Sequence, residues 1–85
     1  MKVRVRYFAA LREAVAVDAE EVVLPETVRT VAELRAWLAA RGGAWAEQMA
    51  PERPLRAAVE QRMVPAHAPL VAGGEVAFFP PVTGG

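Results

Sequence analysis

The chain has 85 residues, of which 54% are hydrophobic and 24% are charged. This length suffices for one small domain, and the composition is typical of a folded globular protein. Ten basic residues balance ten acidic ones, which excludes the basic field that attracts nucleic acid or an anionic membrane, so neither is an expected partner.

Several classes of site are excluded by what the sequence lacks. Cysteine is absent, so disulfides, thiolate metal sites and cysteine nucleophiles are excluded. The single histidine, His67, stands in a Pro/Ala-rich stretch and is expected at the surface, so no metal site is predicted. No apolar run approaches the ~18 residues that span a bilayer. Residues 1–4 lead directly into a strand pattern without a signal-peptide core, and a cytoplasmic location is expected.

The first part of the chain predicts a strand, a short helix and a second strand. Hydrophobic and basic residues alternate over residues 2–7, the two-residue period of a half-buried strand. Good helix formers follow over residues 9–15. Residues 21–24 predict the second strand, which Pro25 ends.

The longest helix is predicted to begin directly after Thr30. Its side chain is a suitable N-cap, and Glu33 stands three residues later, which is the spacing of a capping box. Hydrophobic side chains then follow one helical stripe, with Trp37 as an expected core residue. The pair Gly42-Gly43 is expected to end the helix.

The rest of the chain predicts two or three further strands. Residues 44–54 are the least regular and contain one predicted turn of helix around residues 45–49. Alternation over residues 55–60 predicts a third strand, and the turn signal Gly73-Gly74 precedes a last strand over residues 75–79. This order predicts an α+β roll, with a four- to five-stranded mixed sheet packed on one main helix.

The C-terminus differs from an ordinary polar chain end. Two prolines follow the last strand, and proline lacks the N–H that a strand ladder needs, so pairing should stop there. Residues 80–85 reach about 20 Å when extended. The terminal Gly84-Gly85 lacks Cβ atoms and therefore suits a narrow passage. We predict a domain over residues 1–79 and an extended functional tail over residues 80–85.

The last strand is expected to present one aromatic side chain to solvent. If Val76 and Phe78 point to the core, alternation turns Ala77 and Phe79 outward. An outward aromatic beside an apolar tail is typical of a docking surface. The expected partner-binding residues are Phe79, Pro80, Pro81, Val82, Thr83 and Gly84.

Four stretches carry a family resemblance: YFAALRE at residues 7–13, the helix over residues 31–40, LRAAV at residues 55–59 and GGEVAFFPPVTGG at residues 73–85. Together they resemble the small subunit of molybdopterin synthase, a ubiquitin-like sulfur carrier. The resemblance covers nearly the whole chain and is weakest over residues 42–54. The ending from residue 78 onward is its most specific part.

The resemblance implies a β-grasp fold and a role in molybdenum cofactor biosynthesis. In the family, the terminal glycine, here Gly85, is adenylated by an ATP-using E1-like adenylyltransferase and then receives sulfur as a thiocarboxylate from a sulfur donor enzyme. The tail enters the large catalytic subunit, where the sulfur converts precursor Z (cyclic pyranopterin monophosphate) to molybdopterin. Two small and two large subunits usually form a heterotetramer. One departure is Glu60-Gln61, where many relatives have an Asn-containing turn.

The residues agree with this chemistry. An ionised C-terminal carboxylate is a poor electrophile, so sulfur replaces oxygen only after a leaving group is installed. Neither internal Gly-Gly pair begins a GxxxxGK[ST] phosphate loop, so ATP is expected on the activating partner and no cofactor on this chain. Without cysteine, Gly85 is the expected carrier of the sulfur. The glutamates Glu13, Glu21, Glu33 and Glu75 lack convergent spacing and are expected as surface charges.

Three alternatives remain open from the residues. The first is a sulfur carrier of another pathway, such as the synthesis of the thiamine thiazole. The second is a ubiquitin-like modifier that is joined to lysines through Gly85. The third is a plain interaction module that uses Pro80-Pro81, which ranks last because two prolines do not make a PxxP ligand.

Overall fold

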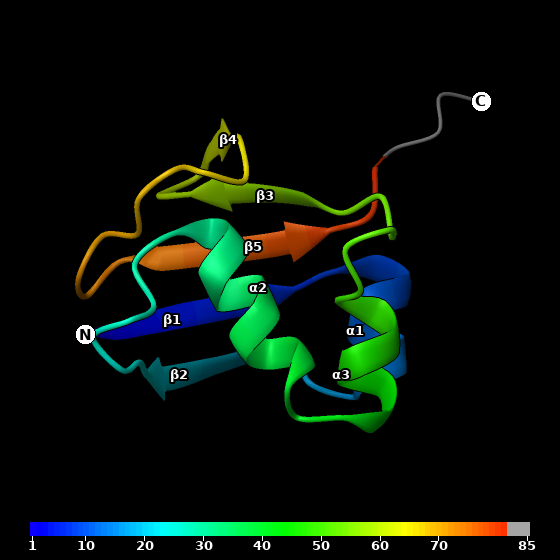
Figure 1. The fold of residues 1–85 in the computed structure, drawn as a ribbon. Helices are drawn as coiled ribbons and strands as arrows, with labels where there is room; N and C mark the ends of the chain where they lie inside the picture. Colours follow the sequence, from blue (N-terminus) through cyan, green and yellow to red (C-terminus); the bar gives the residue numbers. More distant parts are fainter. Residues whose placement is uncertain (82–85) are drawn as a thin grey trace.

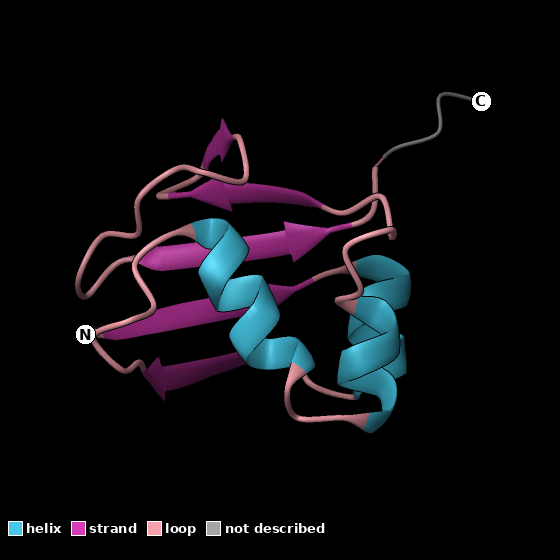
Figure 2. Ribbon diagram, in the orientation of Figure 1, coloured by secondary structure: helices cyan, strands magenta, loops and turns pink. Residues whose placement is uncertain are grey.

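The chain folds into one mixed sheet with helices on one side of it (Figures 1 and 2). The computed structural model describes residues 1–81, so the expectations for Val82, Thr83, Gly84 and Gly85 lie outside the described residues. The elements in chain order are β1 (Lys2–Tyr7), α1 (Ala9–Val15), β2 (Ala19–Val23), α2 (Val31–Ala39), α3 (Gly43–Gln48), β3 (Arg56–Val59), β4 (Arg62–Val64) and β5 (Glu75–Phe79).

The sheet has five strands in the order β2-β1-β5-β3-β4. The central neighbours β1 and β5 are parallel, and the other three pairs are antiparallel. The expected mixed sheet and β-grasp roll are therefore confirmed, with five strands. Because β5 is a central strand that runs parallel to β1, the chain leaves the sheet at the end opposite to the N-terminus (Figure 1).

The hydrophobic core lies between the sheet and α2. The burial pattern of β1 alternates at every residue, as predicted, and α2 buries one stripe of side chains against the sheet. Burying a large apolar side chain of this kind contributes about 1.5–3 kcal/mol. Trp37, expected in the core, is half-buried and packs against the core's edge. The buried residues of these two elements are Val3, Val5, Tyr7, Val31, Leu34 and Leu38.

The capping box at the start of α2 is confirmed. The Glu33 backbone N–H donates to Thr30 Oγ1 at 3.2 Å, and the Thr30 N–H donates to Glu33 Oε1 at 3.1 Å. These reciprocal bonds satisfy two donors that a helix N-terminus otherwise leaves without partners. The hydrogen bond from the Arg29 N–H, followed by those from the Thr30 side chain and N–H, lowers the pKa of the Glu33 carboxyl.

The helices differ from the expectation in number. The prediction of one main helix with a single turn after it was incomplete, because α3 is a separate helix. α2 ends at Ala39 with Ala40 as its C-cap, before the predicted stop at Gly42-Gly43, and these glycines instead start α3, with Gly42 as its N-cap at φ 79°. Within residues 1–81, no helix is long and apolar enough to cross a membrane.

Two strand predictions need correction. The second strand begins at Ala19, two residues before the predicted start, because these residues also pair with β1. The third strand begins at Arg56, and its alternation fails at Ala58, which was expected outside but is 8% exposed. Ala58 lies on the central part of the sheet, opposite Met63 of β4 on one side and Ala77 of β5 on the other.

Candidate functional site

The end of β5, where the tail begins, has the geometry that the sequence predicts. Val76 and Phe78 are buried at 1% exposure each, and Ala77 and Phe79 are half-exposed on the other face of the sheet. Phe79 is the last paired residue of β5 and lies opposite Arg56 of β3. Strand pairing therefore stops immediately before the two prolines, as their missing N–H groups require.

The root of the tail, which we define as Phe79, Pro80 and Pro81, is held from both neighbouring strands. On the β1 side, the Phe8 N–H donates to the Phe78 carbonyl at 3.2 Å, just before the chain turns into α1. On the β3 side, the neighbour is Arg56. All three root residues are half-buried. The remaining expected site residues, 82–85, lie outside the described part of the chain.

The sheet face opposite to the helices carries a hydrophobic strip that starts at the tail root. We call Ala58, Met63, Ala77 and Phe79 the open-face strip. Ala58 lies opposite both Ala77 of β5 and Met63 of β4, so the strip crosses three adjacent strands. Met63 is 61% exposed, which is unusual for so large an apolar side chain. An apolar surface that continues into a chain terminus is a typical docking surface.

Basic side chains lie beside this strip on β1. Arg6 stacks over the Phe8 ring with its guanidinium carbon 4.9 Å from the ring centroid. It also forms an exposed ion pair with Glu75 at 3.4 Å. The burial pattern of β1 places Lys2 and Arg4 on the same exposed side as Arg6. The face that surrounds the tail root is thus apolar in its centre and basic at one side, which suits a partner with an acidic rim.

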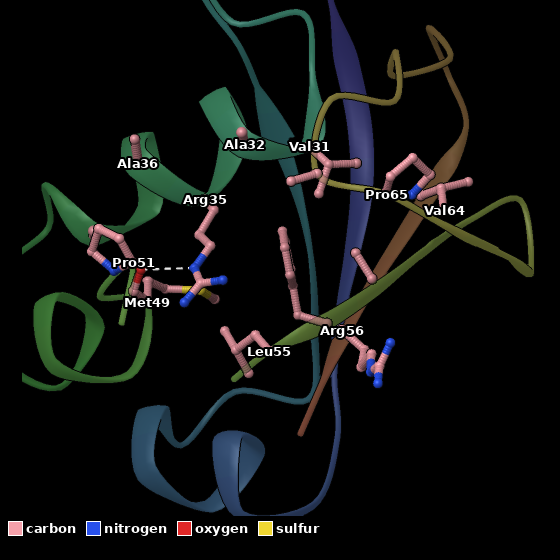
Figure 3. A pocket seen from close by; sticks show the side chains of 14 residues that line it. Val31, Ala32, Arg35, Ala36, Met49, Pro51, Leu55, Arg56, Val64 and Pro65 are labelled. Carbon is pink, nitrogen blue, oxygen red and sulfur yellow. Dashed lines mark hydrogen bonds between the residues drawn. The ribbon is translucent and has the colours of Figure 1, made fainter. Parts of the chain in front are cut away.

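A groove of about 660 Å³ lies on the helix side of the sheet, between α2 and the strands β3 and β4 (Figure 3). The Arg35 side chain extends from α2 into it. Its Nε donates to the Met49 carbonyl at 2.9 Å, and its Nη2 donates to the Arg53 carbonyl at 2.8 Å and to the Ala50 carbonyl. Among the residues that line the groove are Val31, Arg35, Ala39, Met49, Leu55 and Val64.

A second polar cluster, which sequence reasoning missed, lies on the β2 side of the sheet. The Tyr7 hydroxyl donates to Glu20 Oε2 at 2.8 Å, and Arg41 donates to both Glu20 oxygens at 2.8 and 3.0 Å. The Arg41 guanidinium also lies over the Trp45 ring, 4.5 Å from its centroid. The available signal was the inward position of Tyr7, because a buried phenol needs a hydrogen-bond partner.

The electrostatics of this cluster indicate a structural role. The hydrogen bonds that Glu20 accepts from Arg41 are the main cause of its lowered pKa. Burial, followed by the Glu20 hydrogen bond, raises the pKa of Tyr7. Each group is thereby held in its ordinary charge state at neutral pH, which does not suit proton transfer.

No catalytic or metal constellation accompanies the tail root in residues 1–81. In that range, no three histidine or acidic side chains gather as a metal site would require. Three of the four glutamates expected at the surface, Glu13, Glu21 and Glu33, are exposed, and Glu75 is half-buried in its ion pair. His67 is exposed, as expected.

Comparison with known proteins gives matches along nearly the whole chain. The model of the ThiS family matches residues 5–85. The molybdopterin synthase sulfur carrier subunit of Escherichia coli is 46% identical over 83 residues, which cover 98% of this chain and 99% of that protein. The subunit of the same name from Haemophilus influenzae is 38% identical over 81 residues, which cover 95% of this chain and 96% of that protein. Among solved structures, a protein from Pyrococcus furiosus described as molybdopterin converting factor subunit 1 has a TM-score of 0.77 at 34% identity. The match covers 96% of this chain and 99% of that one.

Proposed function

Since the chain belongs to the ThiS family, we propose that it is a sulfur carrier of molybdenum cofactor biosynthesis, the small subunit of a molybdopterin synthase. Two relatives that carry this name align with it almost end to end. The observation that carries the proposal from the structure is the tail root. There a central strand ends at Phe79 and two prolines direct the chain out of the sheet.

The proposed reaction takes place at the carboxyl group of Gly85. An ATP-using E1-like adenylyltransferase converts the carboxylate to an acyl-adenylate and releases pyrophosphate. A sulfur donor enzyme then supplies sulfide-equivalent sulfur, which displaces AMP and leaves a thiocarboxylate. The sulfur is finally transferred within the complex, where precursor Z becomes molybdopterin and Gly85 returns to a carboxylate. This chain provides the carrier atom, while its partners provide the ATP site and the catalytic acids and bases.

The main partner is proposed to be the large catalytic subunit, in a heterotetramer of two small and two large subunits. The open-face strip and the tail root form one continuous apolar surface for this contact. Phe79 belongs to both, so the docking surface and the tail that enters the partner are linked at one residue. The residues proposed to enter the partner's channel are Pro80, Pro81, Val82, Thr83, Gly84 and Gly85.

The prolines reduce the entropic cost of inserting the tail. Ordering the backbone of six residues costs about 1–2 kcal/mol per residue. Pro80 and Pro81 restrict the free chain beforehand and so lower this cost. Burial of Phe79 and Val82 contributes about 1.5–3 kcal/mol each. Burial of these two side chains thus offsets only part of the ordering cost, and the globular surface is proposed to supply the rest of the affinity.

The test is the intact mass of the protein after incubation with ATP, the cognate activating enzyme and a sulfur source. We expect one oxygen to be replaced by sulfur, and fragmentation to localise the exchange to Gly85. A variant without Gly85 and a variant with one alanine added after it serve as controls. Both should fold as the wild type does, by circular dichroism, and neither should gain sulfur.

Three outcomes contradict the proposal. An unchanged mass with an activating enzyme that is active on another carrier argues against a sulfur carrier. Higher-mass conjugates that survive denaturation, without any thiocarboxylate, favour the ubiquitin-like modifier. Binding to a thiazole synthase and not to the large molybdopterin synthase subunit favours the thiamine pathway.

A further inference from the structure

One side chain remains unexplained by the proposed function, namely Arg35 in the groove between α2 and β3. Within residues 1–81, no carboxylate lies within ion-pair distance of it. Its guanidinium instead binds three backbone carbonyls. A half-buried charge without a counterion is costly. Burial accordingly lowers the pKa of Arg35, although the charge of Glu52 opposes this effect.

The three carbonyls belong to the stretch that connects α3 with β3. Met49 is the C-cap of α3, so Arg35 satisfies a carbonyl that a helix end leaves without a partner. The Ala50 and Arg53 carbonyls belong to the turns that follow, where the Arg53 N–H donates to Ala50 at 2.9 Å and the Leu55 N–H donates to Arg53 at 2.8 Å. One guanidinium thus binds the connection at three points, in addition to the exposed ion pair of Arg53 with Glu47 of α3.

Side-chain packing holds the two ends of this connection, at Met49 and Leu55, but contributes little to its middle, residues 51–54. The groove of about 660 Å³ separates it from α2, and Pro51 and Leu55 line that space (Figure 3). Residues 51–54 are all exposed. By contrast, the stripe of α2 that packs on the sheet is fully buried and independent of Arg35. Loss of the Arg35 hydrogen bonds should therefore release residues 51–54 while the core remains intact.

The connection ends beside the tail root. It leads through Leu55 directly into Arg56, which lies opposite Phe79. Figure 1 shows the chain from α3 to β3 passing next to the point where the tail leaves the sheet. A partner that receives the tail must surround its root. Residues 51–54 are therefore within the area that such a partner faces, in addition to the open-face strip.

We propose that residues 51–54 form a second contact for the large subunit, beside the tail root, and that Arg35 is the positioning residue for this contact. The inference rests on the proposed function, because it assumes a partner that takes in the tail. Glu52 and Arg53 supply one charge of each sign and Pro51 and Pro54 supply two rigid apolar rings. Such an exposed, preorganised segment contributes affinity without a folding cost on binding.

The test compares Arg35→Lys with Arg41→Lys in binding to the cognate large subunit by isothermal titration calorimetry. Lysine keeps the charge but cannot reach three separate carbonyls. Arg41 is a matched control because its guanidinium also makes structural hydrogen bonds and contacts α3. Its hydrogen bonds go to Glu20 on the β2 side, and its contact with α3 is the Trp45 ring. We expect Arg35→Lys to weaken Kd by about tenfold, and Arg41→Lys by less than about twofold.

A second variant tests the contact without touching Arg35. Glu52→Ala/Pro54→Ala removes exposed side chains and should weaken the same Kd by about three- to tenfold, with an unchanged Tm. The rate of sulfur transfer at saturating large subunit should be unchanged in every variant. The inference is overturned if Arg35→Lys weakens Kd no more than Arg41→Lys does, or if the double variant binds as the wild type. Failure of the wild type itself to bind or to transfer sulfur would instead refute the proposed function.

Discussion

The Tyr7 hydroxyl lies 2.8 Å from Glu20 Oε2 and donates its hydrogen bond there, in the cluster that Arg41 completes. This contact joins β1 to β2 across the edge of the core. It supplies the hydrogen-bond partner that the buried phenol requires. The cluster leads to a prediction about stability and pH.

We expect Glu20→Gln to lower the free energy of unfolding by roughly 1–2 kcal/mol at pH 7, because the charged hydrogen bonds to Arg41 are lost. The pKa of Glu20 is lowered by folding, so its contribution is fully present above the unfolded value of 4.5 and is lost as the pH falls through the folded value. Urea unfolding of both proteins from pH 7 downward measures this. A difference that stays constant below pH 4.5 would contradict it.

The turn between β3 and β4 contains two residues that its backbone conformation does not favour. Glu60 and Gln61 adopt φ values of 50° and 66°, the left-handed region that a two-residue hairpin turn requires and that favours asparagine and glycine. We expect Glu60→Asn/Gln61→Gly to raise the free energy of unfolding by about 0.5–1.5 kcal/mol. Chemical denaturation measures the change. The reverse order, Glu60→Gly/Gln61→Asn, should stabilise less, and a loss of stability in the Asn-Gly variant would refute the account.

The end of α1 allows a matched pair of glycine substitutions. Ala16, the C-cap of α1, has φ 60°, and glycine adopts this conformation without steric cost. We expect Ala16→Gly to stabilise the protein by about 0.5–1 kcal/mol. Ala14 is exposed inside the same helix, where glycine costs about 1 kcal/mol. Thermal unfolding should therefore shift in opposite directions for Ala16→Gly and Ala14→Gly, and equal shifts would contradict the prediction.

The open-face strip is testable by truncation of Met63. This side chain is 61% exposed, so its removal should hardly change Tm. We expect Met63→Ala to weaken the binding of the cognate large subunit by about 1–2 kcal/mol, because an apolar contact is lost.

A suitable control for Met63 is Val23 on the other edge of the sheet. Val23 of β2 lies opposite Lys2 of β1 and is 74% exposed, but β1 lies between β2 and β5, the strand that ends at the tail root. Val23→Ala should leave the affinity for the large subunit unchanged in the same titration. Equal losses for Met63→Ala and Val23→Ala would show that the strip does not define the docking surface.

Much of the fold was predictable because it depends on neighbours in sequence. The alternation in β1 and β5, the capping box of α2 and the outward position of Phe79 each follow from residues at most four positions apart. The proposed site also follows from local sequence, since it consists of a chain end and its proline lead-in. The proposed carrier, Gly85, stays a prediction from the sequence and the family.

Other features depended on contacts between distant residues. The burial of Ala58, which alternation placed outside, becomes visible only in the assembled sheet, where Ala58 lies between Met63 and Ala77. The sequence analysis assigned no role to Arg35 or Glu20, because their partners lie 13 to 21 positions away in the sequence.

The sequence by itself determined the elements, their inward faces and the nature of the chain end, because backbone periodicity, capping and proline geometry act over a few residues. The tertiary structure alone decided what surrounds that end. Only strand order and register bring β3, β4 and the connection held by Arg35 next to Phe79. The physical reason is that hydrogen bonds and packing between separate elements form only when the sheet closes, so no local pattern encodes them.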